Sequence, residues 1–234
     1  MENILFDKLE IEEVFDKMNT KKASNDPIPN ILLKIVGSLC STHILNKVIE
    51  SKTWPKMWKI ADIVPLAKDK IPDYNNVRPI SILSSFNKCL EQLLKKRIMP
   101  FYIKHINQTQ FGFIPMGSTS SALIAILDKI FSLLDNKSII AVSMISFDMK
   151  KAFDKVNHQL LLDKLSDFIP STFCEILASY FFSQQQRVKV NTWYNDFCDI
   201  DFGEPQGSVL SPILFGFFMN DSLYCHTLFF FKIR

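Results

Sequence analysis

A chain of 234 residues with 47% hydrophobic side chains can bury a substantial core, which excludes a disordered protein. The net charge is only +3, and the five cysteines include no Cys-x-x-Cys pair, which excludes the usual zinc patterns. The amino terminus shows no signal peptide, and the apolar segments near the carboxyl end are shorter than the ~20 residues of a membrane-spanning helix. We therefore expect an intracellular protein, nuclear or cytoplasmic, without a membrane anchor.

The first half of the chain is predicted to be mostly helical. Apolar residues recur at helical spacing in three segments, and a short apolar run precedes a loop containing proline, aspartate and asparagine. We expect helices over residues 11–18, 31–49 and from Ser85 onward, a strand over 61–66 and a loop over 68–76.

Positive charge is concentrated in the middle of the chain, where residues 31–110 carry 13 basic and 5 acidic side chains. Such a segment suits a protein that binds a phosphate backbone. The alternative is an ordinary solvated helix face, because Lys95-Lys96-Arg97 lies beside the apolar stripe of the third predicted helix. The sequence alone leaves both interpretations open.

The second half mixes strands and helices without regular alternation, which predicts an α+β domain. Ser118 or Thr119 can cap a helix that continues to Leu134, and Thr172-x-x-Glu175 has the form of a capping box. We expect strands over 139–147, 187–190 and 197–200, the last two paired across the turn at 193–196, and helices over 160–168, from 172 and over 213–219.

The predicted strand 139–147 ends at Asp148, directly before Met-Lys-Lys-Ala-Phe-Asp. A carboxylate at a strand end can hold a divalent metal ion, and hard ions such as Mg²⁺ prefer oxygen ligands. A strand that ends in aspartate can equally be a solvated turn. The neighbouring motifs decide between these two interpretations.

Six motifs follow one another in a fixed order, at residues 22–29, 58–68, 78–83, 110–119, 148–154 and 203–212. In this order and spacing the chain resembles the reverse transcriptase (RNA-directed DNA polymerase) of non-LTR, LINE-type retrotransposons over nearly its whole length. The resemblance implies a right-hand polymerase fold with helical fingers over residues 1–135 and a partial palm sheet over 136–234, without a thumb. It also implies an RNA template, a DNA primer and deoxynucleoside triphosphates as partners.

The resemblance implies a role for five residues at the incoming nucleotide. Asp148 corresponds to the first catalytic aspartate and metal ligand of the family, which uses two Mg²⁺ ions in nucleotidyl transfer. Phe153 would lie under the sugar and exclude a 2′-hydroxyl. Lys68 and Arg78 would contact the triphosphate, Arg78 through its planar fork of donors. Gln206 would contact the nascent base pair.

Four further residues would contact template or primer by the same resemblance. Pro205 and Gly207 flank Gln206 in the Pro-Gln-Gly turn, and Gly207 would let the backbone approach the nucleic acid closely. Gln110 and Gly112 would help to position the template, although their role could equally be packing within the fingers.

The chain departs from the family pattern in one important respect, since no Asp-Asp pair occurs anywhere in the sequence. Glu204 also stands where the family commonly has an apolar residue, and Ser24 where it usually has glycine. We therefore expect a truncated copy with incompletely ligated magnesium and little or no polymerase activity. The alternatives are a non-catalytic RNA-binding remnant of a retrotransposon, or a helical interaction module without a nucleic-acid role.

Overall fold

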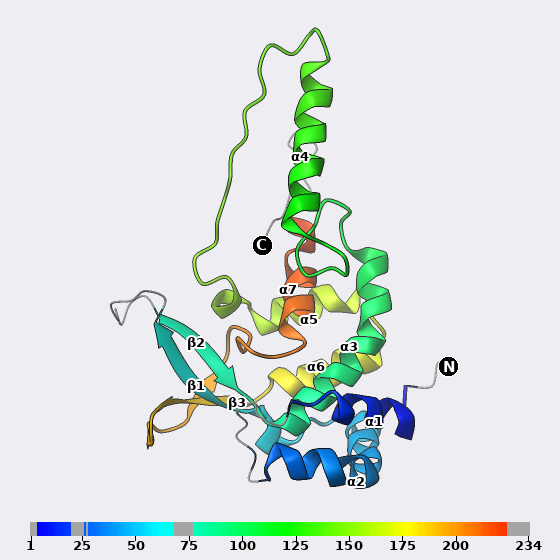
Figure 1. Cartoon of the computed structure of the whole chain (residues 1–234), viewed down its shortest axis with the longest axis vertical. Coiled ribbons are helices and arrows are strands. Elements are labelled where there is room, and N and C mark those ends of the chain that lie inside the picture. Colours follow the sequence, from blue (N-terminus) through cyan, green and yellow to red (C-terminus); the bar gives the residue numbers. More distant parts are fainter. Residues whose placement is uncertain (1–3, 20–25, 27, 68–76, 224–234) are drawn as a thin grey trace.

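The computed structural model describes residues 4–19, 26, 28–67 and 77–223. It is an α+β structure in which a small twisted sheet lies beside a helical body, and one helix projects away from both (Figure 1). The helices are α1 (Lys8–Asp16), α2 (Asn30–Ser51), α3 (Ser85–His105), α4 (Thr119–Leu134), α5 (His158–Ser166), α6 (Ser171–Phe181) and α7 (Ser211–Phe218). Short 3-10 turns are η1 (Lys56–Lys59), η2 (Phe153–Lys155) and η3 (Asn220–Leu223).

The long helix α3 lies at the centre of the helical body. Its inward face includes fully buried leucine and isoleucine side chains, and the helix packs against α1 on one side and α7 on the other. The Ser84 side chain caps the helix by accepting a hydrogen bond from the backbone amide of Asn87. The predicted helix from Ser85 is thus confirmed, as are the two helices that precede it.

The sheet combines strands from distant parts of the chain. Its strands are β1 (Ile60–Ala67), β2 (Val77–Ile82), β3 (Gln184–Val190), β4 (Trp193–Tyr194) and β5 (Cys198–Ile200). β1 pairs antiparallel with β2 and parallel with β3, and β3 pairs antiparallel with both β4 and β5. The two predicted strands thus lie in one sheet, but the predicted pairing of 187–190 with 197–200 is wrong: β5 pairs with residues 184–186, and residues 189–190 pair with β4, which occupies part of the predicted turn.

The predicted strand 139–147 is wrong. Residues 140–149 have no regular secondary structure, and apolar side chains such as Ile140 and Phe147 are 99% and 82% exposed. The segment returns from the tip of α4 towards the body as an extended chain that no strand flanks (Figure 1). A strand requires a paired neighbour to satisfy its backbone, so alternating apolar residues cannot form one alone.

One smaller prediction was also wrong. The capping box at Thr172 does not form, because α6 begins earlier, at Ser171, with Pro170 as its N-cap residue. The predicted helix over 213–219 is present as α7, which has Leu210 at its N-cap. The predicted loop over 68–76 lies outside the described residues. Within the described part of the chain, no helix is long and apolar enough to cross a bilayer.

Candidate functional site

The Pro-Gln-Gly turn at 205–207 is attached to strand β2 by its backbone. The amide of Ser81 donates a 2.9 Å hydrogen bond to the carbonyl of Gln206. Gly207 has φ +141°, and a Cβ atom at this position would lie 2.7 Å from the carbonyl oxygen of Ser81. Glycine is thus required here by a close approach to protein backbone. Contact of Gly207 with nucleic acid stays a prediction.

On its other side the turn is attached to η2. Gly203 donates a 2.7 Å hydrogen bond to the carbonyl of Val156, and Glu204 donates one of 3.0 Å to the carbonyl of Phe153. The side-chain amide of Gln206 donates to Oδ1 of Asp154 over 3.0 Å. Asp154, the last residue of the motif at 148–154, was not predicted as a site residue. Its spacing from Asp148 in the motif was the only available signal.

His158 also holds this turn, although no pattern in the sequence assigned it a role. Its Nε2 lies 2.6 Å from the carbonyl oxygen of Gly203, and its ring stacks on Phe181 with centroids 4.4 Å apart. Because a carbonyl accepts, Nε2 must carry the proton. Burial lowers the pKa of His158, while the hydrogen bond to Gly203 opposes that shift.

Three aromatic rings meet beside the turn. The ring of Phe153 lies 4.6 Å from that of Phe215 on α7 and 5.9 Å from that of Phe113, centroid to centroid. Phe113 belongs to the motif at 110–119, so the cluster joins this motif to the one at 148–154. Phe153 as a whole residue is half-buried.

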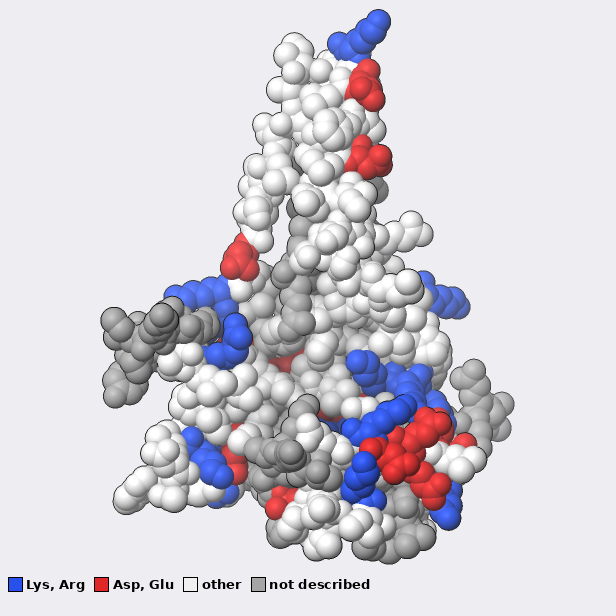
Figure 2. Space-filling model, viewed as in Figure 1, with Lys and Arg blue, Asp and Glu red and all other residues white. Residues whose placement is uncertain are grey.

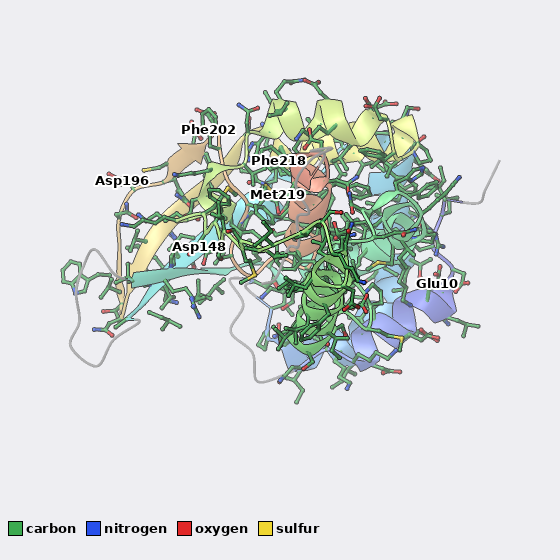
Figure 3. All side chains as sticks on the ribbon, turned by 90° about the horizontal axis from the view of Figure 1, so that it is seen from above. Glu10, Asp148, Asp196, Phe202, Phe218 and Met219 are labelled. Carbon is green, nitrogen blue, oxygen red and sulfur yellow. The ribbon has the colours of Figure 1, made fainter. Side chains whose placement is uncertain are left out.

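Asp148 is exposed and lies between the sheet and α7 in the view of Figure 3. Among the described residues no group of three or more His, Cys, Asp or Glu side chains is close enough together to hold a metal ion. Asp154, the nearest acid in the motif, is engaged by Gln206. The described residues therefore do not form a complete magnesium site.

The remaining predicted residues differ in their exposure. Arg78 is exposed on β2, the strand whose Ser81 holds the turn, whereas Lys68 lies outside the described residues. Gln110 is fully buried and donates to the hydroxyl of Tyr102 over 2.8 Å and to the carbonyl of Gly112 over 3.2 Å. Gln110 thus packs within the structure, which is the alternative that the sequence left open.

Glu204 is 4% exposed, and neither of its carboxylate oxygens has a hydrogen-bond partner. The nearby hydroxyl of Ser211 instead donates to the carbonyl of Pro205 over 3.2 Å. Burial raises the pKa of Glu204 well above its ordinary value; the Ser211 hydroxyl opposes this shift, and the negative charge of Glu91 adds to it. The residue that departs from the family pattern is thus a buried acid close to a second buried acid, Glu91.

Two of the basic side chains on α3 form ion pairs with α1. Arg97 makes hydrogen bonds of 2.6 and 2.7 Å to the two carboxylate oxygens of Glu10, and Lys96 lies 3.2 Å from Glu13. Figure 2 shows basic and acidic side chains intermixed over this part of the surface. Glu10 lies far from Asp148 (Figure 3), so these cations are not at the candidate site.

Comparison with known proteins identifies related sequences. Residues 67–225 match the family described as reverse transcriptase (RNA-dependent DNA polymerase). The chain is 30% identical over 220 residues to the probable RNA-directed DNA polymerase from transposon BS of Drosophila melanogaster, which covers 91% of this chain and 24% of that protein. It is 29% identical over 220 residues to the RNA-directed DNA polymerase from mobile element jockey of the same species, with 91% and 24% covered. The chain thus spans about a quarter of the length of these relatives.

Proposed function

This chain belongs to the reverse transcriptase (RNA-dependent DNA polymerase) family, in the form carried by non-LTR transposable elements, and we propose that it serves RNA-templated DNA synthesis. The proposal is supported above all by the contact between two motifs. Asp154 of the segment at 148–154 accepts a hydrogen bond from Gln206 of the Pro-Gln-Gly turn. The residues proposed for the nucleotide and for the template are therefore held as one unit.

The proposed nucleotide contacts come from η2, from β2 and from the Pro-Gln-Gly turn. Phe153, which is half-buried, would lie under the sugar, and Arg78 on β2 would contact the triphosphate together with Lys68. Gln206 would contact the nascent base pair with the part of its amide that Asp154 does not engage. Deoxynucleoside triphosphates are accordingly the proposed substrates.

Template and primer are proposed to lie along the turn and the loop at 110–117. Pro205 is half-buried and Gly207 is exposed, so both can meet a base. Gly112 and Gln110 are buried, so their proposed contribution is to fix the shape of the loop that carries Phe113. We also propose that the fingers comprise residues 1–135 and the palm 136–234, with the sheet containing strands from both regions.

Asp148 is proposed as one ligand of Mg²⁺ in two-metal nucleotidyl transfer. Magnesium lowers the pKa of an attacking hydroxyl and balances charge on phosphate. One carboxylate cannot fix two such ions, and accurate placement of the reacting groups supplies much of the rate of an enzyme. We therefore expect little or no polymerase activity from the 234-residue polypeptide by itself.

A second candidate function is RNA binding without catalysis. It is favoured by the lack of a three-ligand acidic cluster among the described residues. Both candidates require nucleic acid at the same surface, and we propose the nucleus or cytoplasm as the compartment where it is met.

The two candidates are separated by comparing the chain with its Asp148→Asn variant. Filter binding would measure retention of an RNA template annealed to a DNA primer at several salt concentrations, and primer extension would be measured with Mg²⁺. Equal, salt-sensitive binding by both proteins without extension would support binding without catalysis. Extension that Asp148→Asn abolishes would support the catalytic role. Absence of any retained RNA would contradict both.

A further inference from the structure

Glu91 is a charged side chain in the interior, on the face of α3 that packs against the body. It is fully buried, where a carboxylate is costly unless several donors surround it. Its Oε1 accepts hydrogen bonds from Nδ2 of Asn87 at 2.7 Å and from the hydroxyl of Tyr180 at 3.1 Å. Its Oε2 accepts a hydrogen bond of 2.5 Å from the backbone amide of Val209. Both oxygens are thus used.

The Oε1 end of this carboxylate is held by large buried rings. Asn87 accepts a 2.8 Å hydrogen bond from the indole nitrogen of Trp54, and the rings of Trp54 and Tyr180 lie 4.6 Å apart between centroids. These side chains are at most 2% exposed, so they have little freedom to move. The direction in which Oε2 points towards Val209 is therefore fixed by the core.

Val209 follows the Pro-Gln-Gly turn with only Ser208 between them. β2 and η2 hold the turn through Ser81 and Phe153. The hydrogen bond from Val209 to Glu91 connects the end of the turn to a third element, α3. The turn is thus fixed to three elements of the structure.

We infer that Glu91 is the positioning residue of the Pro-Gln-Gly turn, fixing the turn against α3 through the amide of Val209 so that the turn can receive the template. The inference rests on the proposed function for the identity of the ligand. Glu91 touches no substrate, and it acts only through Val209. A neutral apolar residue could fill the space but would leave the amide of Val209 without an acceptor.

The donors around Glu91 provide a specific test. In Glu91→Gln, we expect the amide oxygen to stay at the end with two donors, Asn87 and Tyr180, so that the new NH2 group faces the amide of Val209, which loses its acceptor. In the double variant Asn87→Asp/Glu91→Gln, the carboxylate introduced at position 87 accepts from both the new amide and the indole of Trp54. The amide oxygen introduced at position 91 again accepts from Val209. The total charge is the same as in the natural chain.

The control is Asn46→Ala, which removes a side chain that holds the backbone of Phe6 with hydrogen bonds of 2.8 and 2.9 Å, away from the turn. Amide exchange at Val209 and binding of an RNA template annealed to a DNA primer are measured in each protein. We expect Glu91→Gln to speed the exchange of Val209 about tenfold more than Asn46→Ala does, and to weaken binding, with recovery of both in the double variant.

The inference is overturned if exchange at Val209 in Glu91→Gln matches that in Asn46→Ala, or if the double variant exchanges as fast as Glu91→Gln. It is also overturned if exchange rises while binding stays unchanged. Failure of the natural chain to bind the template would contradict the proposed function and the role of the turn in receiving template. The exchange measurement would still decide whether Glu91 holds the turn.

Discussion

The side-chain amide of Gln206 lies 3.0 Å from Oδ1 of Asp154, and this contact joins two motifs that lie far apart in the sequence. Between them the chain forms α5, α6 and the β3–β5 strands before it returns to η2. The contact makes the turn and the segment after Asp148 a single unit, and the first prediction tests their coupling.

Asp154→Ala and Gln206→Ala should lose the same interaction. We expect a double-mutant cycle in urea unfolding to give a coupling free energy of about 0.5–1 kcal/mol between the two residues. The value is modest because the hydrogen bond, from a neutral amide to a charged carboxylate, is exposed to solvent. The control is the exposed pair Gln159 and Asp163, 2.8 Å apart on α5, whose removal should not affect primer–template binding. A coupling of zero would show that the contact does not form in solution.

Replacing Glu204 by Met should stabilise the protein, because the replacement fills the same space without burying an unpartnered carboxylate. The pKa of Glu204 is higher in the folded state than its unfolded value of about 4.5. The group therefore contributes its full stabilisation below the unfolded pKa, and this contribution is lost as the pH rises through the folded pKa. The gain in Tm should therefore grow with pH.

Glu91 also contributes to the pH dependence of stability, because burial raises its pKa as well. Hydrogen bonds from Val209, Ser208, Tyr180 and Asn87 oppose that shift. The contribution of Glu91 remains when Glu204 is replaced. The Glu204→Met protein should thus lose part of the slope of Tm against pH. The exposed Asp163→Asn serves as the control. A lower Tm for Glu204→Met at high pH would contradict the interpretation.

Gly207→Ala should destabilise the fold by about 1–3 kcal/mol, since φ of +141° is strained for alanine and the Cβ would meet the carbonyl of Ser81 at 2.7 Å. Asn191, with φ of 55° in another turn, supplies the control because Asn191→Gly should be neutral or mildly stabilising. Chemical denaturation measures both changes. Equal stability of Gly207→Ala and the natural chain would mean that the turn does not approach β2 this closely.

Arg97→Gln should lower stability without altering RNA binding, because Arg97 is paired with Glu10 at the α1–α3 contact. We expect a loss of about 1–2 kcal/mol for this partly buried bidentate pair. Arg97 lowers the pKa of Glu10, so the contribution is present above the unfolded pKa and is lost as the pH falls through the folded pKa. Lys47→Gln, from an exposed pair 3.6 Å apart, should change little.

The sequence predicted most helices correctly because their apolar stripes and start signals are local. The cap of α4 is one example, where the Ser118 hydroxyl accepts from the amide of Ser121. The segment 139–147 has the alternation of a strand, yet strand formation depends on a partner elsewhere, which a local pattern does not report.

The candidate site was predictable only in part for the same reason. The motif order singled out the Pro-Gln-Gly turn and Phe153, which a backbone hydrogen bond from Glu204 to Phe153 connects; their role at a nucleotide stays a prediction. For Gln110 the sequence offered template contact or packing, and its burial favours packing. A polar residue in an apolar helix face, as at Glu91, was the one available signal for the buried network, since charged residues are rarely buried without partners.

If the proposed function is right, the Pro-Gln-Gly turn faces the template beside the primer end. This is tested by placing a photoreactive amino acid at Gln206, and at Asn195 between β4 and β5 as a control, and irradiating each protein with an RNA template annealed to a DNA primer. We predict a crosslink from position 206 to the template base next to the primer terminus and none from position 195. Crosslinks of equal yield from both positions, or from position 206 only to RNA distant from the primer end, would contradict this placement of the turn.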